Sequence, residues 1–259
     1  MKFSSIELIQ LLNHYLWPFF RIGATVAVAP IFGARTVPAR LRLGLAVMLT
    51  IVIAPLLPMP PTIDPVSVQG MLVTAQQVLI GLAMGFAVLL IFGAFVLGGQ
   101  VFAMQMGLGF AAMVDPQRGV QVPMVSQFYV LVATLIFLTM DGHLVLISVL
   151  AGSFETIPVG VHGLGPAGLW TLVSWISDMF VGAILMALPA ITTLMLVNIA
   201  FGVMMRAAPQ LNIFAVGFPI SLTLGFVIML VMLPNVAPRL VTLVGENFAM
   251  IGRMLAAGT

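Results

Sequence analysis

The chain has 259 residues, of which 62% are hydrophobic and only 6% are charged, whereas soluble globular proteins carry about 25% charged residues. This composition predicts an integral membrane protein. The net charge of +2, with no large basic patch, argues against nucleic acid as a partner, and the absence of cysteine excludes disulfides, thiolate nucleophiles and cysteine-based metal sites.

Apolar runs long enough to cross a hydrocarbon core of about 30 Å, which takes about 20 helical residues, recur along the whole chain. No long polar domain interrupts them. We therefore expect an all-α, polytopic membrane-type protein with about six to seven long helices in a single domain spanning residues 1–259. The runs lie at roughly 14–34, 41–58, 78–97, 125–147, 179–205 and 213–233, with a weaker seventh after Pro238.

The first run contains polar residues that a plain membrane span does not need. A helix over residues 4–21 would place Glu7, Gln10, His14 and Arg21 on one face, which predicts a first span with a polar helix-packing face. The alternative is a cleaved signal peptide ending near Ala27-Val28-Ala29. The polar interruptions argue against it.

The third run is rich in glycine. Gly81 and Gly85 form a GxxxG pair, a spacing that lets helix backbones approach closely. Tight packing within one bundle is the favoured interpretation. The further glycines at 93, 98 and 99 exceed the needs of one chain, and this surplus indicates contacts with neighbouring subunits.

The segment from Met106 to Met124 suits neither lipid nor water. Glycines at 107, 109 and 119 and prolines at 116 and 123 disfavour helix. The segment nevertheless carries apolar side chains, at Met106, Leu108, Phe110, Met113 and Val114. Because apolar, non-helical chain next to a membrane span is tolerated only where protein buries it or where it lines a cavity, this segment predicts a pore or a gate.

The stretch from Gly168 to Met205 contains Pro189 and is about twice as long as one span requires. A hairpin within it is one possibility, and would reverse the orientation of everything downstream. Otherwise, arginines following the first, third and fifth runs place those connections in the cytoplasm and the N-terminus outside. Asp178 precedes the apolar run at Met179, so an interfacial acid at a helix end is favoured over a buried pairing or relay role.

No catalytic constellation is found. His14, His143 and His162 lie far apart without neighbouring ligands, and Gly107-Leu-Gly109 lacks the remaining residues of a dinucleotide fingerprint. The connection from Arg206 to Phe214 is interpreted as a helix break capped by Gln210 or Asn212. These patterns favour a protein that is not an enzyme and that uses no cofactor or metal.

Three segments together resemble a known family. Val37-Pro-Ala-Arg-Leu-Arg-Leu-Gly44, Gln105-Met-Gly-Leu-Gly-Phe-Ala-Ala-Met-Val-Asp-Pro116 and Arg206-Ala-Ala-Pro-Gln-Leu-Asn-Ile-Phe-Ala-Val-Gly-Phe-Pro219 are similar to the FliR family of flagellar biosynthetic proteins. Its homologues serve virulence type III secretion systems. Asp141-Gly-His-Leu144 and Ser153-Phe-Glu-Thr-Ile-Pro-Val-Gly160 look more like the flagellar branch.

The resemblance implies a subunit of a heteromeric, helically arranged export gate in the bacterial inner membrane, within the flagellar basal body. FliP and FliQ would form the gate with it, FlhB and FlhA would surround it together with membrane lipid, and unfolded flagellar proteins would pass through. The hairpin over about 175–235 would be similar to FliQ. The loop over about 106–124 would plug the channel through Met106, Leu108, Phe110, Met113, Val114, Pro116 and Val122. Subunit packing would involve Gly81, Gly85, Pro209, Gln210, Asn212 and Phe214.

Three alternatives remain open. The chain could be the equivalent subunit of a virulence secretion system, or a structural scaffold whose apolar loop only packs against partners. It could also be a secondary transporter with Asp178 and Asn198 lining a site. A single intramembrane acid and the lack of a convincing internal repeat disfavour the transporter.

Overall fold

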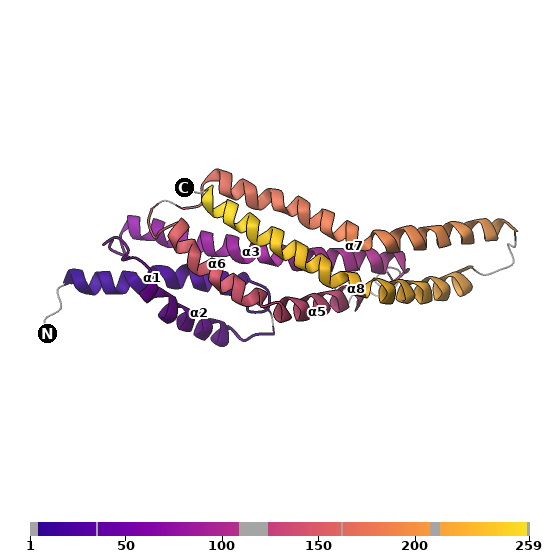
Figure 1. The fold of residues 1–259 in the computed structure, drawn as a ribbon, viewed down its shortest axis with the longest axis horizontal. Helices are drawn as coiled ribbons and strands as arrows, with labels where there is room; N and C mark the ends of the chain where they lie inside the picture. Colours follow the sequence, from indigo (N-terminus) through magenta and orange to yellow (C-terminus); the bar gives the residue numbers. More distant parts are fainter. Residues whose placement is uncertain (1–4, 35, 109–123, 162, 208–212, 258–259) are drawn as a thin grey trace. The chain divides into compact units, whose positions relative to one another are not determined.

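The computed structural model describes residues 5–34, 36–108, 124–161, 163–207 and 213–257, and every regular element within these ranges is helical (Figure 1). Contacts within the chain divide it into two compact units. Unit 1 comprises Met1–Leu90, Asp141–Ile176 and Val244–Thr259, and unit 2 comprises Ile91–Met140 and Ser177–Leu243. The helices are α1 (Ser5–Val28), α2 (Ala39–Ile53), the short 3-10 helix η1 (Ala54–Leu56), α3 (Val68–Gln105), α5 (Met124–Thr139), α6 (Gly142–Thr156), α7 (Pro166–Ala207) and α8 (Ile213–Ala256).

The expected all-α membrane architecture is confirmed, but three helices are much longer than the apolar runs that predicted them. Helices α3, α7 and α8 have 38, 42 and 44 residues, about twice the 20 or so needed for one crossing. The weaker run after Pro238 is the continuation of α8 and not a separate seventh helix. By length and composition, four helical segments of the described chain could cross a membrane, and α5 with α6 could make a fifth.

The possibility of a hairpin around Pro189 is wrong, because α7 is one continuous helix. A proline inside a helix removes one backbone hydrogen bond, the one to the carbonyl four residues earlier, and α7 continues through Pro189 without it. The Thr193 hydroxyl donates to the Pro189 carbonyl at 2.8 Å. The same Pro-x-x-x-Thr arrangement recurs in α8, at Pro219 with Thr223 and Pro238 with Thr242.

The run predicted at 125–147 is broken into α5 and α6. Asp141 adopts a left-handed backbone conformation with φ of 55°, which an α-helix cannot contain. Helix α6 then restarts at Gly142, and its first turn is closed by the backbone N–H groups of Leu144 and Val145 donating to the Asp141 carbonyl. The periodicity of apolar residues continues through this break, so it did not reveal the break.

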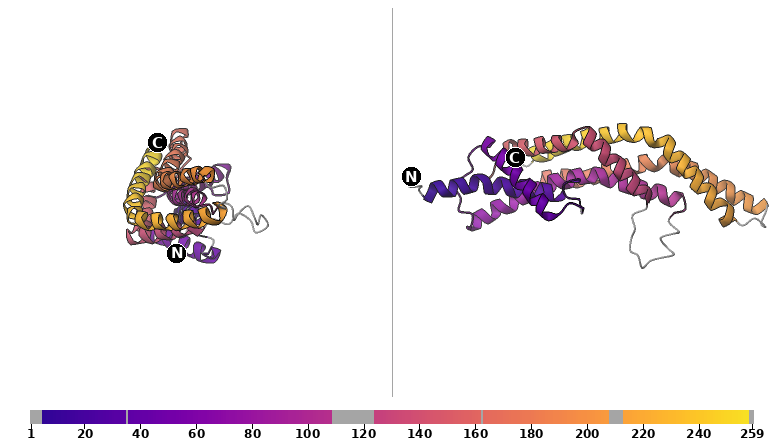
Figure 2. Two further views of the ribbon diagram at one scale, coloured as in Figure 1. Left: turned by 90° about the vertical axis from the view of Figure 1, so that its right-hand side faces the viewer. Right: turned by 90° about the horizontal axis from the view of Figure 1, so that it is seen from below.

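In unit 1, α2 lies along α1 (Figures 1 and 2). Helix α1 begins at Ser5 and ends at Val28, so the run expected at 14–34 was placed too far along the chain. It is also not among the helices apolar enough to cross a membrane. Gly23 faces Ala46 of α2, and a Cβ atom there would lie 3.9 Å from the Ala46 Cβ. The polar packing face predicted for α1 is present only in part. His14 and Arg21 are buried, whereas Gln10 is exposed and the side chain of Glu7 lies outside the described part of the chain.

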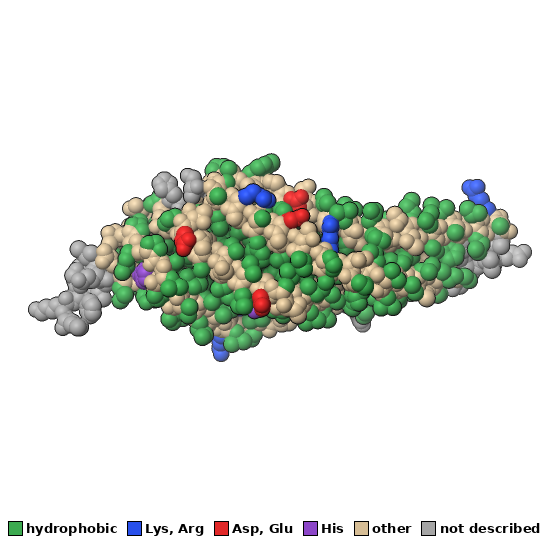
Figure 3. Space-filling model, in the orientation of Figure 1, with side chains coloured by type: hydrophobic (Ala, Val, Ile, Leu, Met, Phe, Trp, Pro, Cys, Tyr) green, Lys and Arg blue, Asp and Glu red, His purple; other side chains and the backbone are tan. Residues whose placement is uncertain are grey.

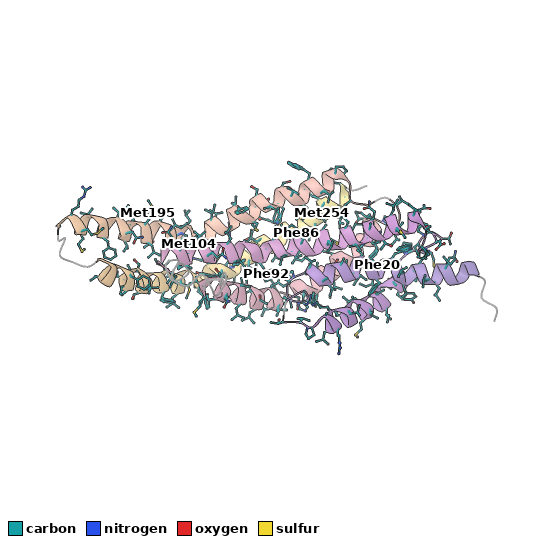
Figure 4. The ribbon with its side chains drawn as sticks, turned by 180° about the vertical axis from the view of Figure 1, so that it is seen from behind. Phe20, Phe86, Phe92, Met104, Met195 and Met254 are labelled. Carbon is teal, nitrogen blue, oxygen red and sulfur yellow. The ribbon has the colours of Figure 1, made fainter. Side chains whose placement is uncertain are left out.

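In unit 2, aromatic side chains join the C-terminal half of α3 to α5. The rings of Phe92 and Phe137 lie 5.5 Å apart, and those of Phe102 and Tyr129 lie 6.1 Å apart, both edge to face. Figure 4 shows Phe92 on α3 beside α5. Beyond α5, α7 and α8 follow each other as an antiparallel hairpin (Figures 1 and 2).

Candidate functional site

Helix α3 ends in a motif built on glycine. Gly107 has φ of +82°, a left-handed conformation that glycine adopts without a Cβ penalty. Its N–H donates to the Met104 carbonyl at 3.0 Å, and the Leu108 N–H donates to the Ala103 carbonyl at 3.1 Å. These two bonds are the Schellman motif that closes a helix C-terminus. Gly107 therefore fixes where α3 stops and where the predicted plug segment begins.

The root of that segment is held against α8, within unit 2. Met106 is fully buried, and its side chain occupies the space over Gly225. A Cβ on Gly225 would lie 2.5 Å from Cγ and 2.7 Å from Cε of Met106, so no larger residue fits without displacing it. Gly107 in turn lies against Phe218, where a Cβ would be 3.2 Å from the ring. Leu108 is half-buried.

The rest of the predicted plug lies outside the described residues, namely Phe110, Met113, Val114, Pro116 and Val122. The plug therefore stays a prediction whose first two apolar members, Met106 and Leu108, have a structural setting. Among the residues predicted to pack against other subunits, Pro209, Gln210 and Asn212 also lie outside the described part, as does the side chain of Phe214.

The Gly81 and Gly85 pair packs α3 against α1 of the same chain. A Cβ on Gly81 would overlap the Arg21 carbonyl oxygen, and one on Gly85 would lie 2.9 Å from the Thr25 carbonyl oxygen. The Thr25 hydroxyl also donates to the Gly81 carbonyl at 3.1 Å. This is the packing within one bundle that the sequence favoured, and a role for the pair between subunits stays a prediction.

Beside this contact lies a buried arginine whose bonding partners the sequence did not reveal. Arg21 is fully buried, and its Nε–H donates to Gln77 Oε1 at 2.9 Å. Its Nη1 donates to the carbonyl and hydroxyl of Ser153, and its Nη2 donates to the Ile157 carbonyl at 2.8 Å. The guanidinium also lies over the Phe154 ring, 4.1 Å from its centre.

No carboxylate accepts from Arg21 in the described chain, so its charge is balanced in another way. Ser153 and Ile157 carry carbonyls at the C-terminal end of α6, where the helix dipole is negative and a cation is favourable. Arginine remains charged in proteins. The side chain thus joins α1, α3 and α6 while it completes the end of α6. A recognisable signal existed in the spacing of Gln77, Gly81 and Gly85, which places one polar and two small residues on one face of α3.

Two asparagines add polar links within unit 1. Asn13 Nδ2 donates to the Ile63 carbonyl at 2.7 Å, which fixes the connection between η1 and α3 onto α1. Asn247 of α8 donates to the Ala87 carbonyl of α3 at 2.8 Å. Both asparagines are fully buried. A buried hydrogen bond of this kind contributes about 1 kcal/mol, but losing one partner costs about 1–3 kcal/mol.

The acid–base chemistry available in the described residues is sparse. They contain no group of three His, Cys, Asp or Glu side chains placed to hold a metal ion. A shallow depression beside His14 is lined by prolines, Met59 and Phe154 and has no acidic side chain among its lining residues. Asp178 is exposed and lies well inside α7, so the expectation that it sits at a helix end is wrong.

A large apolar surface is exposed. Only 28% of the most apolar window of α7 and 17% of that of α8 is buried, and the value for α2 with η1 is 22%. In the face that Figure 3 shows, charged side chains are few and scattered among hydrophobic ones. Figure 4 shows two of the exposed side chains, Met104 on α3 and Met195 on α7. An apolar surface of this extent requires lipid or protein to cover it.

Comparison with known proteins agrees with this picture. The model of a family described as "Bacterial export proteins, family 1" matches residues 12–246. The flagellar biosynthetic protein FliR of Escherichia coli (strain K12) is 38% identical over 99% of this chain and 98% of its own length. FliR of Pectobacterium carotovorum subsp. carotovorum is 38% identical over 98% of this chain and 97% of its own length. FliR of Bacillus subtilis (strain 168) is 31% identical over 87% of this chain and 88% of its own length. The chain therefore belongs to bacterial export proteins family 1, the family of the flagellar biosynthetic protein FliR.

Proposed function

We propose that the chain is a core subunit of the flagellar type III protein export gate in the bacterial inner membrane, within the flagellar basal body. It would assemble with FliP and FliQ into a channel for unfolded flagellar proteins, next to FlhB and FlhA. Its segment over about 106–124 would close the channel at rest. The subunit acts by gating and not by catalysis. The observation that carries this proposal is full-length similarity to FliR proteins.

The structure supports assembly through its uncovered apolar helices. Leu196 and Val203 on α7 and Leu230 and Val231 on α8 are each 65–71% exposed. Because α7 and α8 are much longer than one membrane crossing, lipid alone does not account for their full length. Partner helices that continue the packing would cover the remainder. The likeness of this hairpin to FliQ is part of the proposal.

The end of α3 supports the gating role. The Schellman motif ends the helix at a defined residue, and Met106 anchors the root of the following segment on α8. A segment fixed at its root can block a channel without drifting from it. Methionine and phenylalanine side chains in that segment would seal by close apolar packing and then repack around chains of variable sequence.

Purification in a mild detergent tests the assembly. The tagged chain, expressed from its own chromosome, should elute in one heteromeric particle of fixed composition that mass spectrometry identifies as containing FliP and FliQ. A structural scaffold would also give such a particle, whereas a transporter would elute as a monomer or dimer. Elution without these partners would contradict the proposal.

Permeability separates a gate from a scaffold. Deleting residues 110–116 should leave the particle assembled but make the membrane leak ions or small molecules, measured as dye uptake or loss of membrane potential. Gly152→Ala is a suitable control, because a Cβ at Gly152 meets nothing within 4 Å. Unchanged permeability in cells with a normal amount of particle would reject the plug.

A further inference from the structure

The helices of unit 1 are joined by hydrogen bonds from buried polar side chains. Arg21 links α1 to α3 and α6, and Thr25 links α1 to the Gly81 carbonyl of α3. Asn247 links α8 to α3. Hydrogen bonds have a preferred length and direction, and a buried donor that loses its acceptor is costly. These bonds therefore oppose sliding of α1, α3, α6 and α8 along one another.

Unit 2 is held in a different way. Its described side-chain hydroxyls, such as those of Thr134, Thr193 and Thr223, donate to carbonyls of their own helices. Among the residues of unit 2 that the structure describes, no side-chain hydrogen bond connects two helices. The contacts between these helices therefore set no fixed register by hydrogen-bond geometry.

Methionine side chains on glycines occupy the contacts of α3 with α7 and α8 in unit 2. A Cβ on Gly93 would lie 2.9 Å from Sδ of Met179. One on Gly98 would lie 3.0 Å from the Ala183 carbonyl oxygen and 3.1 Å from Sδ of Met186. At the end of α3, Met106 fills the space over Gly225 of α8. Methionine is unbranched, flexible and polarisable, and it adapts to changed surroundings at low cost. Glycine offers a smooth backbone without a side chain to interlock.

Helices α7 and α8, which contact α3 here, also have fewer backbone hydrogen bonds than a regular helix. Pro189 in α7 and Pro219 and Pro234 in α8 each remove a backbone hydrogen bond. Met179 and Met186 are seven residues apart, so both lie on the same face of α7. Few buried apolar contacts are a feature that lowers the free energy of a local rearrangement, and only 28% of the most apolar window of α7 is buried.

We infer that α7 is the yielding helix of the subunit and slides along α3 on the methionine–glycine contacts of unit 2. The helices α1, α3, α6 and α8, which buried side-chain hydrogen bonds join in unit 1, keep their register. Small sliding of packed helices is a recognised mode of conformational change, called shear. The inference rests on the proposed export function and adds to it the contacts that must move when a chain passes.

An engineered disulfide tests this inference cleanly, because the chain contains no cysteine. In the pair Gly98→Cys with Met186→Cys, the two Cβ atoms would lie about 3.5 Å apart, at the short end of the range of disulfides. The control pair is Gly23→Cys with Ala46→Cys in unit 1, with a separation of 3.9 Å. Both pairs are introduced into the full-length chain in cells that lack the native copy, and secreted flagellar protein is measured.

Under reducing conditions, both pairs should support export within about twofold of the native level. Oxidation should lower export at least tenfold for the pair in unit 2 and leave the control pair unchanged, and a reductant should restore the loss. Export that persists with a fully formed disulfide between positions 98 and 186 would overturn the inference, as would an equal loss from both pairs. If cells lacking the whole chain exported normally, the proposed function itself would fail, which is a distinguishable result.

Should reduced Gly98→Cys with Met186→Cys fail to support export, the pair Gly93→Cys with Met179→Cys serves as the second probe of the same contact. Crosslinked fractions are measured by the mobility of the chain on non-reducing gels. The same two readings apply: reversible loss of export on oxidation agrees with sliding, and retained export contradicts it.

Discussion

At the scale of single residues, a charged side chain carries much of the order in unit 1. Arg21 is buried without a carboxylate and relies on carbonyls at the end of α6, on Gln77 and on the Phe154 ring. Its planar guanidinium donates to several acceptors at once in a fixed geometry that the ammonium group of lysine does not provide. Removing the guanidinium would leave Gln77 Oε1 and the Ile157 carbonyl buried without this donor.

Replacing this arginine should therefore destabilise the chain strongly. We expect Arg21→Met to lower the free energy of unfolding by about 1–3 kcal/mol, because it leaves buried neutral acceptors without their donor. Arg21→Lys should lower the free energy of unfolding by roughly half as much. Thermal unfolding of the purified protein in detergent measures the change.

Arg40 provides the matched comparison, since it is exposed at the start of α2. Arg40→Met should change the free energy of unfolding by no more than about 0.5 kcal/mol. Equal effects of the two substitutions would show that the Arg21 network does not stabilise unit 1.

The glycines of unit 1 give a second residue-scale prediction with opposite signs. Gly81→Ala would place a Cβ on the Arg21 carbonyl oxygen and force α1 away from α3. We expect a loss of about 1–3 kcal/mol, as for other overpacked sites. Gly152→Ala meets nothing within 4 Å inside α6, and should stabilise by about 0.4–1 kcal/mol. The order of the two thermal midpoints checks the prediction.

At the scale of elements, each of the six main apolar runs in the sequence contains a helix, but their ends and the break within the fourth run were not predicted. Long apolar runs identified the helices because burial and membrane insertion both select apolar residues. The ends were misplaced because a window of about 20 residues suits a single crossing, whereas α3, α7 and α8 continue beyond it. The break at Asp141 was missed because apolar spacing continues on both sides of it.

The candidate site was predictable to a similar degree. Gly107 stood out in the sequence as a helix breaker, and the structure gives it the specific role of closing α3. The pairing of Met106 with Gly225 could not be predicted, because 119 residues separate the two and no local pattern marks the contact. Long-range partners of this kind also hid the bonds from Arg21 to Ser153 and Ile157.

The end of α3 makes an element-scale prediction. Gly107→Val should destabilise by about 1–2 kcal/mol or more, because a side chain at positive φ clashes with the following carbonyl, whereas Gly107→Asn should cost less, since asparagine tolerates this conformation. Hydrogen exchange of the last turn of α3 measures the fraying. Protection that is the same in both variants would argue against the helix-ending role.

The contact between α3 and α8 predicts a coupling between two substitutions. Gly225→Ala displaces Met106 and should destabilise the protein, and Met106→Ala should do so by about 2–5 kcal/mol through the cavity that it leaves. The double variant should lose less than the sum, with a coupling of about 0.5–3 kcal/mol. Strict additivity in a double-mutant cycle would show that the two residues do not share this space.

At the scale of the whole molecule, the chain combines a hydrogen-bonded interior in unit 1 with apolar faces that it does not cover itself. The uncovered faces on α2, α7 and α8 agree with membership of an export family and with the assembly proposed for this subunit. Two nearby leucines of α7 represent two kinds of apolar side chain, one buried within the chain and one exposed on its surface. Leu194 is fully buried in the chain, whereas Leu196 is 68% exposed.

Changing each leucine to asparagine should therefore cause a different defect, in the stability of the chain or in its assembly. Leu194→Asn buries an amide without a partner, at a cost of about 1–3 kcal/mol in addition to the lost packing, and the chain itself should be degraded. Leu196→Asn leaves the internal core intact, so the chain should accumulate, yet the particle with its partners should weaken. Immunoblots of membranes report the first quantity, and co-purification in mild detergent reports the second. If Leu196→Asn changed neither, Leu196 would not lie in the contact with the partners, and the assembly would have to use other exposed residues of α7, or α2 or α8.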